Sequence, residues 1–220
     1  MFFILLSFLI CIGIPVMGGI YFAWKRKGTF LAFLLGILSF SISQLLIRIP
    51  LLSFLGDHFS WFSFLPYLNP ILYYAILALS AGIFEESGRL IGLSCLRKKQ
   101  ISWLQGLAFG LGHGGVEAVW IAWQGLIPSL FDHTLFLFPD QALFVGLERL
   151  CTMSFHIALT MVVLKGIWKN RKLLYWILAV FLHAAADFSI VTQNPVIIWS
   201  VLIFSSVLSL LYLVRTKHSF

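Results

Sequence analysis

Seven runs of about 20 mostly apolar residues follow one another along this chain, and they restrict its fold more than any other feature. An α-helix of that length crosses the hydrocarbon core of a bilayer. Only 10% of the 220 residues are charged, against about 25% in soluble domains. The sequence therefore predicts an all-α, multi-pass membrane helix bundle in which residues 1–220 form one integral-membrane domain. The predicted spans are residues 2–24, 29–51, 69–96, 101–125, 139–165, 172–192 and 195–214.

The basic residues predict how these spans are oriented. Twelve of the fifteen Lys and Arg residues fall on one side of a seven-span bundle, and the other side holds Asp57, Asp132 and Asp140 and no Lys or Arg. Basic loops stay in the cytoplasm, so we expect the N-terminus outside and the C-terminus in the cytoplasm. The net charge of +7 follows from this orientation, and no nucleic-acid partner is expected. The basic set is Lys25, Arg26, Lys27, Arg97, Lys98, Lys99, Lys165, Lys169, Arg171, Lys172, Arg215 and Lys217.

A second group of ionisable residues lies inside the predicted spans, where each charge costs about 2.5–3.5 kcal/mol. Members on four helices lie 9 to 14 residues from the basic boundary, which is roughly 14–21 Å along a helix. Scattered structural ion pairs have no reason to share a depth. We therefore expect the helices between about residues 69 and 192 to gather them at one site. The group comprises Glu85, Glu86, Arg89, His113, Glu117, Glu148, Arg149, His156, His183 and Asp187.

Spacing within the group predicts which residues share a helix face. Residues four apart on a helix are neighbours on its surface. Glycine and alanine stripes beside them predict close helix packing, for example at Gly106, Gly110 and Gly114. Three pairs have this spacing, and the first is predicted to form an ion pair: Glu85 and Arg89, His113 and Glu117, and His183 and Asp187.

Three short motifs occur in order along this region: "EESGR" at 85–89, "FGLGH" at 109–113 and "HAAAD" at 183–187. Together they resemble the motifs of the CAAX-protease and bacteriocin-processing superfamily of intramembrane proteases. The chain is most similar to the YhfC-type branch, through "HGGVE" and "ERLCTMSFH". The resemblance covers roughly residues 80–190. It implies an endopeptidase of the bacterial cytoplasmic membrane that hydrolyses a membrane-embedded or membrane-associated peptide.

The first motif departs from the superfamily pattern. The superfamily leaves three residues between its second glutamate and the arginine, whereas "EESGR" leaves two. The glutamate that activates water is therefore open between Glu85, Glu86 and the nearby Glu117.

The resemblance favours a glutamate mechanism that requires no metal. In it, Glu85 or Glu86 activates water together with His113, and Arg89 orients a carboxylate. His183 and Asp187 then stabilise the oxyanion or position the substrate.

A zinc mechanism would use much the same residues. The candidate ligands are His113, Glu117, His156 and His183, and a remaining glutamate would act as base. The H-E-x-x-H motif of many zinc proteases is absent.

Two other classes of protein also place histidines and acids inside a membrane. A proton- or ion-coupled transporter would use them as a relay, but it would favour internal repeats and helices broken at the site. A non-catalytic membrane partner, such as a bacteriocin-immunity-type protein, is the other alternative.

Overall fold

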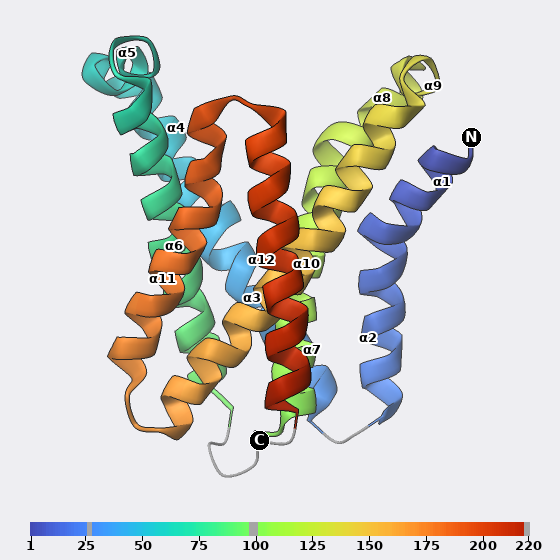
Figure 1. Ribbon diagram of the computed structural model, residues 1–220, viewed down its shortest axis with the longest axis vertical. Coiled ribbons are helices and arrows are strands. Elements are labelled where there is room, and N and C mark those ends of the chain that lie inside the picture. The colour runs from blue at the N-terminus through green and yellow to red at the C-terminus, as the bar shows by residue number, and fades with distance from the viewer. Residues whose placement is uncertain (26–27, 97–100, 218–220) are drawn as a thin grey trace.

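The computed structural model describes residues 1–25, 28–96 and 101–217. Every regular element in these ranges is helical, and Figure 1 shows them as a bundle, so the all-helical prediction is confirmed. Several basic residues on which the predicted orientation rests lie outside the described residues: Arg26, Lys27, Arg97, Lys98 and Lys99.

Short π-helical and 3₁₀ segments join several α-helices into longer rods. The elements are α1 (Phe2–Phe8), η1 (Leu9–Gly13), α2 (Ile14–Lys25), α3 (Thr29–Phe40), η2 (Ser41–Arg48), α4 (Ile49–His58), α5 (Ser60–Leu68), α6 (Pro70–Ser94), α7 (Trp103–Ile121), η4 (Ala122–Leu126), α8 (Ile127–Phe131), α9 (Thr134–Leu137), α10 (Pro139–Trp168), α11 (Lys172–Phe188), η5 (Ser189–Thr192) and α12 (Pro195–Thr216).

Local sequence signals set the starts of the long helices. Asn69 accepts a hydrogen bond from the backbone of α6 and is followed by Pro70 at the first helical position. Asn194 begins α12 in the same way. At α7, Ser102 and Gln105 form a reciprocal capping box.

Within the described residues, five helical rods are long and apolar enough to cross a membrane, judged by length and composition. A sixth results if α5 and α6, which meet at 117°, count as one span. The remaining predicted span corresponds to α7, whose glycines, His113 and Glu117 make it less apolar. The five rods are Phe2–Lys25, Thr29–His58, Pro139–Trp168, Lys172–Thr192 and Pro195–Thr216.

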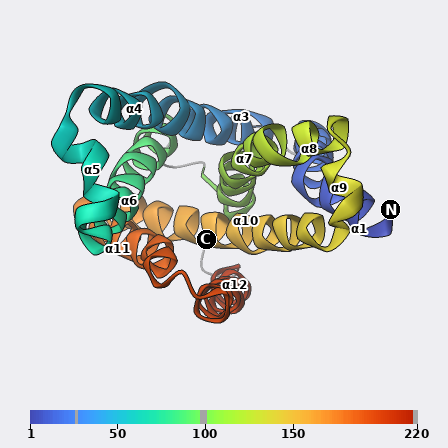
Figure 2. The same cartoon turned by 90° about the horizontal axis from the view of Figure 1, so that it is seen from above.

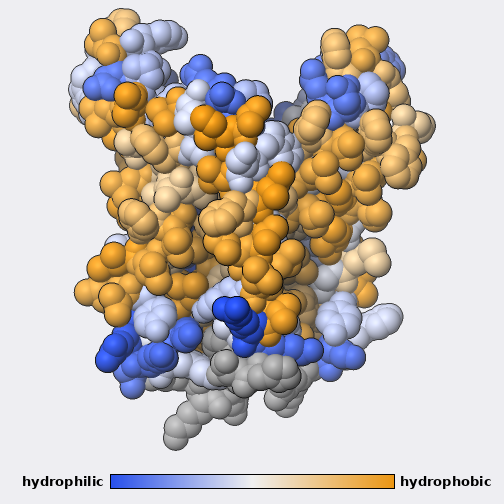
Figure 3. Space-filling view, in the orientation of Figure 1, coloured by the Kyte–Doolittle hydropathy of each residue, from blue (hydrophilic) through white to orange (hydrophobic). Residues whose placement is uncertain are grey.

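The surface agrees with an integral multi-pass membrane protein. On the face that Figure 3 shows, apolar residues cover the middle of the molecule and hydrophilic residues gather towards both ends. Large apolar side chains such as Leu46 and Phe204 are exposed on the surface of the bundle. Helix α1 begins at one end and α12 finishes at the opposite end (Figure 1). This agrees with an odd number of crossings, while the inside–outside assignment stays a prediction.

Helix α7 lies between α3 and α10 (Figure 2), and glycines allow the close approach. A Cβ at Gly36 would overlap the carbonyl oxygen of Phe109, and one at Gly112 would overlap that of Phe33. On the other side of α7, a Cβ at Gly110 would lie 2.6 Å from the Cα of Ile157. The predicted glycine stripe thus packs α7 against α10, and the polar side chains of both helices meet in the bundle interior.

Candidate active site

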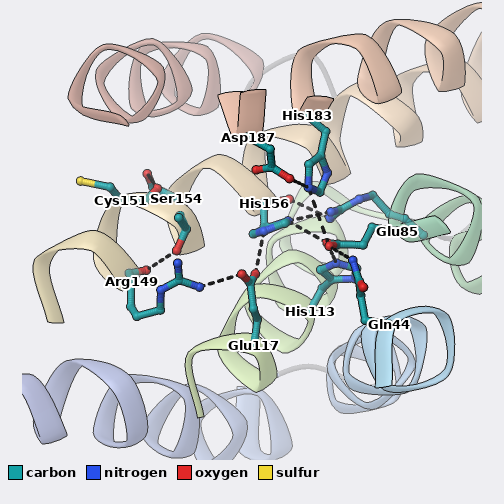
Figure 4. Close-up of polar contacts among 12 residues, drawn as sticks. Gln44, Glu85, His113, Glu117, Arg149, Cys151, Ser154, His156, His183 and Asp187 are labelled. Atoms are coloured by element: carbon teal, nitrogen blue, oxygen red, sulfur yellow. Dashed lines mark hydrogen bonds and ion pairs between the residues drawn. The ribbon is translucent and has the colours of Figure 1, made fainter. Parts of the chain in front are cut away.

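Side chains from α6, α7, α10 and α11 converge around Glu85 in the interior of the bundle (Figure 4). The convergence brings together residues separated by up to about a hundred positions in the sequence. Six of them are almost completely buried: Glu85, Glu86, Arg89, His113, His156 and His183.

Glu85 occupies the centre of this cluster. One carboxylate oxygen accepts a short hydrogen bond from the side-chain amide of Gln44, and the other lies 3.0 Å from Nε2 of His113. Two more ring nitrogens face it, Nδ1 of His156 at 3.9 Å and Nε2 of His183 at 3.8 Å. These two distances are too long for hydrogen bonds. Glu85 therefore faces three histidines from three helices and bonds directly to one.

Glu86 faces a different part of the bundle from Glu85. Arg89 donates to its two oxygens at 2.8 and 3.2 Å, and Nδ1 of His183 lies 2.9 Å from Oε1. The predicted ion pair between Glu85 and Arg89 is therefore wrong, since the arginine pairs with Glu86 three residues earlier. Consecutive side chains on a helix diverge by about 100°, so Glu86 bonds to Arg89 while Glu85 bonds to His113, and His183 lies near both.

Arg89 also determines which ring nitrogen of a neutral His156 carries the proton. Its Nη2 lies 2.9 Å from Nδ1 of that ring. A guanidinium can only donate, so Nδ1 accepts and a neutral ring carries its proton on Nε2. Nε2 lies 2.8 Å from Oε2 of Glu117. The result is a chain from Glu86 through Arg89 and His156 to Glu117.

Glu117 is held by Arg149 at one oxygen and lies beside His156 at the other. Its Oε1 accepts from Arg149 at 2.7 Å, and Arg149 also forms a short ion pair with Glu148. Its Oε2 is buried and lacks hydrogen-bond geometry to any described residue, although His156 is close. His113 and Glu117, four apart on α7, contact other helices instead: His113 bonds to Glu85 on α6, and Glu117 pairs with α10.

Asp187 lies at the edge of the cluster. Its Oδ2 is 3.5 Å from Nε2 of His183, and its side chain is 40% exposed. A cavity of about 450 Å³ opens beside it and reaches Glu85, Glu117 and His156. The site is therefore a buried polar cluster that forms one wall of a cavity inside the bundle.

Every predicted site residue is part of this cluster or its edge, and two further residues join it. Gln44 and Arg48 lie on η2, and Nη1 of Arg48 donates to Oε1 of Gln44 at 3.0 Å. Sequence reasoning missed Gln44 because it considered only ionisable groups. The sequence did contain a signal for Gln44, because a glutamine four residues before an arginine is unusual in an apolar span.

Glu85, His156 and His183 each offer one ligand atom, and these atoms lie within 4.8 Å of one another. The set contains two of the four predicted zinc ligands, and His113 and Glu117 lie beside it. Two histidines and one glutamate are the ligands of several catalytic zinc sites.

The surroundings of His183 fit a cation well. If Nδ1 donates to Glu86, the lone pair of Nε2 faces the carboxylates of Glu85 and Asp187. A lone pair directed at two carboxylates is stable only with a proton or a metal ion between them. His156 fits less freely, because an ion at its Nδ1 would compete with Arg89.

Fold and site together define a multi-pass helical membrane protein with a buried histidine–glutamate cluster. Residues 7–142 and 130–208 match the family described as YhfC intramembrane metalloprotease, and the chain belongs to this family. The resemblance to YhfC proteins is thereby confirmed. The family description names a metalloprotease and does not support the expectation that no cofactor is required.

A curated relative in Bacillus subtilis (strain 168), named "Uncharacterized membrane protein YhfC", is 31% identical over 143 residues. The match covers 53% of this chain and 55% of the relative, so the chain spans about half of that protein's length. No solved structure matches the chain.

Proposed function

We propose that this protein is a metal-dependent intramembrane endopeptidase that hydrolyses a peptide bond of a membrane-embedded or membrane-associated substrate. One observation carries the proposal: Glu85, His156 and His183 offer three ligand atoms within 4.8 Å at the wall of a membrane cavity. The family description supports the same class of enzyme.

Glu85, His156 and His183 would hold the ion, and zinc suits two histidines and one carboxylate. When bound, Zn²⁺ would act as a Lewis acid towards the scissile carbonyl and make a water molecule more acidic. Side chains of the protein itself would position the ligands and the substrate and take the proton from water.

Glu86 and Arg89 act as positioning residues in this proposal. Hydrogen bonds from Arg89 fix the carboxylate of Glu86, which in turn accepts from Nδ1 of His183. A carboxylate behind a ligand histidine fixes the ring orientation and makes its other nitrogen a better ligand. Both residues are fully buried, so neither touches substrate.

Glu117 is the best general base among the three candidate glutamates. Its Oε2 has no well-aligned hydrogen bond, since Nε2 of His156 lies 2.8 Å away but outside hydrogen-bond geometry, and this oxygen can take a proton from water while Arg149 holds the other. Glu85 and Glu86 have both oxygens engaged already. The metal-free route expected from the resemblance needs one of these two to activate water, so the geometry favours Glu117.

His113 and Asp187 have supporting roles. His113 bonds to Glu85 through Nε2 and to Ser39 through Nδ1, so it orients the glutamate from behind. Asp187 is the more exposed acid beside the cavity and is suited to position the substrate or the water.

Cleavage of a membrane-embedded peptide by the purified protein tests this function. We expect Glu117→Gln to abolish cleavage while the bound metal remains, and Asp57→Asn, an exposed acid on α4, to leave cleavage unchanged. Full activity of Glu117→Gln would remove the proposed base. Full activity of protein shown by elemental analysis to be metal-free would overturn the metal-dependent proposal.

A further inference from the structure

Arg48 enters the same cavity from η2 without an acidic partner. Its Nε donates to Ser80 at 3.0 Å, one terminal nitrogen donates to Gln44 at 3.0 Å, and the other donates to the carbonyl of Leu77 at 2.7 Å. All three acceptors are neutral. A guanidinium has five N–H groups, so these bonds leave one on each terminal nitrogen for a ligand.

The other two arginines of the site differ in this respect. Arg89 pairs with Glu86, and Arg149 pairs with Glu117 and Glu148. In the part of the chain that the structure describes, no carboxylate forms an ion pair with Arg48. Glu85 and Asp187 act on this guanidinium electrostatically without forming an ion pair with it. A half-buried guanidinium among apolar helices is stabilised further by an anion in direct contact.

The position of Arg48 relates it to the reaction centre. Gln44 donates to Glu85 and accepts from Arg48, so one side-chain amide separates the guanidinium from the proposed metal ligand. An extended peptide advances about 3.3–3.6 Å per residue. A substrate group bound to Arg48 would therefore lie about two residues from the bond that is cleaved. Ile49, Tyr74 and Leu77 also line the cavity.

We infer that Arg48 is a carboxylate-binding subsite, and that the substrate carries an acidic group within about two residues of the cleaved bond. The group is an aspartate or glutamate side chain or a C-terminal carboxylate. Two free N–H groups on a planar guanidinium suit two carboxylate oxygens. This inference rests on the proposed function, since it names the substrate of that site.

A matched set of peptides tests the subsite. Each of the three positions on either side of the cleaved bond carries Asp, Asn or Lys in turn, and each peptide has a free or an amidated C-terminus. In phosphatidylcholine nanodiscs, which contain no anionic headgroup, we expect Asp at one position to raise kcat/KM about 10- to 100-fold over Asn, mainly through KM, as for hydrogen bonds to charged groups. If only the free C-terminus has this effect, the terminal carboxylate is the ligand.

Charge reversal separates recognition from a structural role. Arg48→Gln should remove the preference for Asp, and Arg48→Glu should transfer it to Lys at the same position. A merely structural arginine would instead lower kcat for every peptide alike. Arg171→Gln, an exposed arginine at the opposite end of the bundle, should keep the wild-type preference.

Binding of the same peptides, each carrying a label, is measured separately from cleavage, so this test does not depend on catalysis. Wild-type protein should bind the acidic member more tightly than the Asn member, and Arg48→Glu should reverse the order for acidic and Lys members. Equal binding of Asp and Asn peptides, or an order unchanged by charge reversal, overturns the subsite. Cleavage without any acidic preference overturns it too and leaves the proposed function intact, whereas acidic preference in binding without cleavage contradicts only the protease proposal.

Discussion

Nδ1 of His183 lies 2.9 Å from Oε1 of Glu86, although the two residues are 97 positions apart in the sequence. The contact joins α11 to α6 inside the bundle, and Arg89 holds the same carboxylate from the other side. It leaves Nε2 of His183 facing Glu85 and Asp187. The two consecutive glutamates thus have different contacts: Glu86 bonds to Nδ1 of His183 and to Arg89, whereas Glu85 bonds to His113 and faces Nε2 of His183. The different roles proposed for them follow from these contacts.

Glu86→Gln should destabilise the protein far more than Glu85→Gln. The first change leaves the fully buried guanidinium of Arg89 without its counter-charge, and breaking a buried ion pair costs about 3–5 kcal/mol. The second removes one negative charge from a cluster that has several. Thermal unfolding in detergent measures the difference, and equal shifts of Tm for the two variants would contradict this assignment.

Purified protein should contain about one zinc ion per chain, and chelation should abolish cleavage. His156→Ala and His183→Ala should each remove the ion because they delete ligands. The matched control is His58→Ala, whose ring bonds only to a backbone carbonyl on exposed α4 and which should keep full occupancy. Elemental analysis provides the readout; zinc retained in both ligand variants would rule out this ligand set.

Gln44→Leu should lower cleavage while the protein stays folded. The change removes the donor that holds one oxygen of Glu85, and loss of a group behind a metal ligand typically costs about 10- to 100-fold in affinity or activity. Gln124→Leu is a suitable control, since Gln124 lines the same cavity on η4 without a contact to Glu85. Similar kcat/KM values for the two variants would mean that Gln44 has no positioning role.

Gly112→Ala should destabilise the bundle, because the new methyl group would overlap the carbonyl oxygen of Phe33. Overpacking of this kind costs about 1–3 kcal/mol. Gly56→Ala makes the same change in a helix with open space around it and should be neutral or stabilising by about 0.5–1 kcal/mol. Denaturation of both variants checks the contrast; an unchanged Tm for Gly112→Ala would show that α3 and α7 can move apart.

The helical membrane fold and the region of the site follow from the sequence. The length of each apolar run matches the thickness of the bilayer core, and ionisable residues are rare within such runs. The YhfC resemblance could be recognised from short motifs because their ionisable residues are rare in apolar spans. The span formed by α7 is not among the five rods identified by length and composition, and its glycines and polar residues serve contacts inside the bundle.

The partners within the site could not be predicted in the same way. Spacing of four residues suggested that Glu85 pairs with Arg89 and His113 lies with Glu117. Instead Arg89 pairs with Glu86 on its own helix, His113 bonds to Glu85 on α6, and Glu117 contacts His156 on α10. Gln44 lies on the π-helical segment η2, where wider turns change which residues share a face. Of the three pairs predicted from the four-residue spacing, His183 and Asp187 do lie close together, so local periodicity predicts only some of the contacts within the site.

The sequence by itself determined that this chain spans a membrane and that its polar residues lie at a common depth, because both properties depend only on position along each helix. The tertiary structure decided which nitrogen faces which carboxylate. Helix rotation and packing select those partners, and they arise only when separate helices come together.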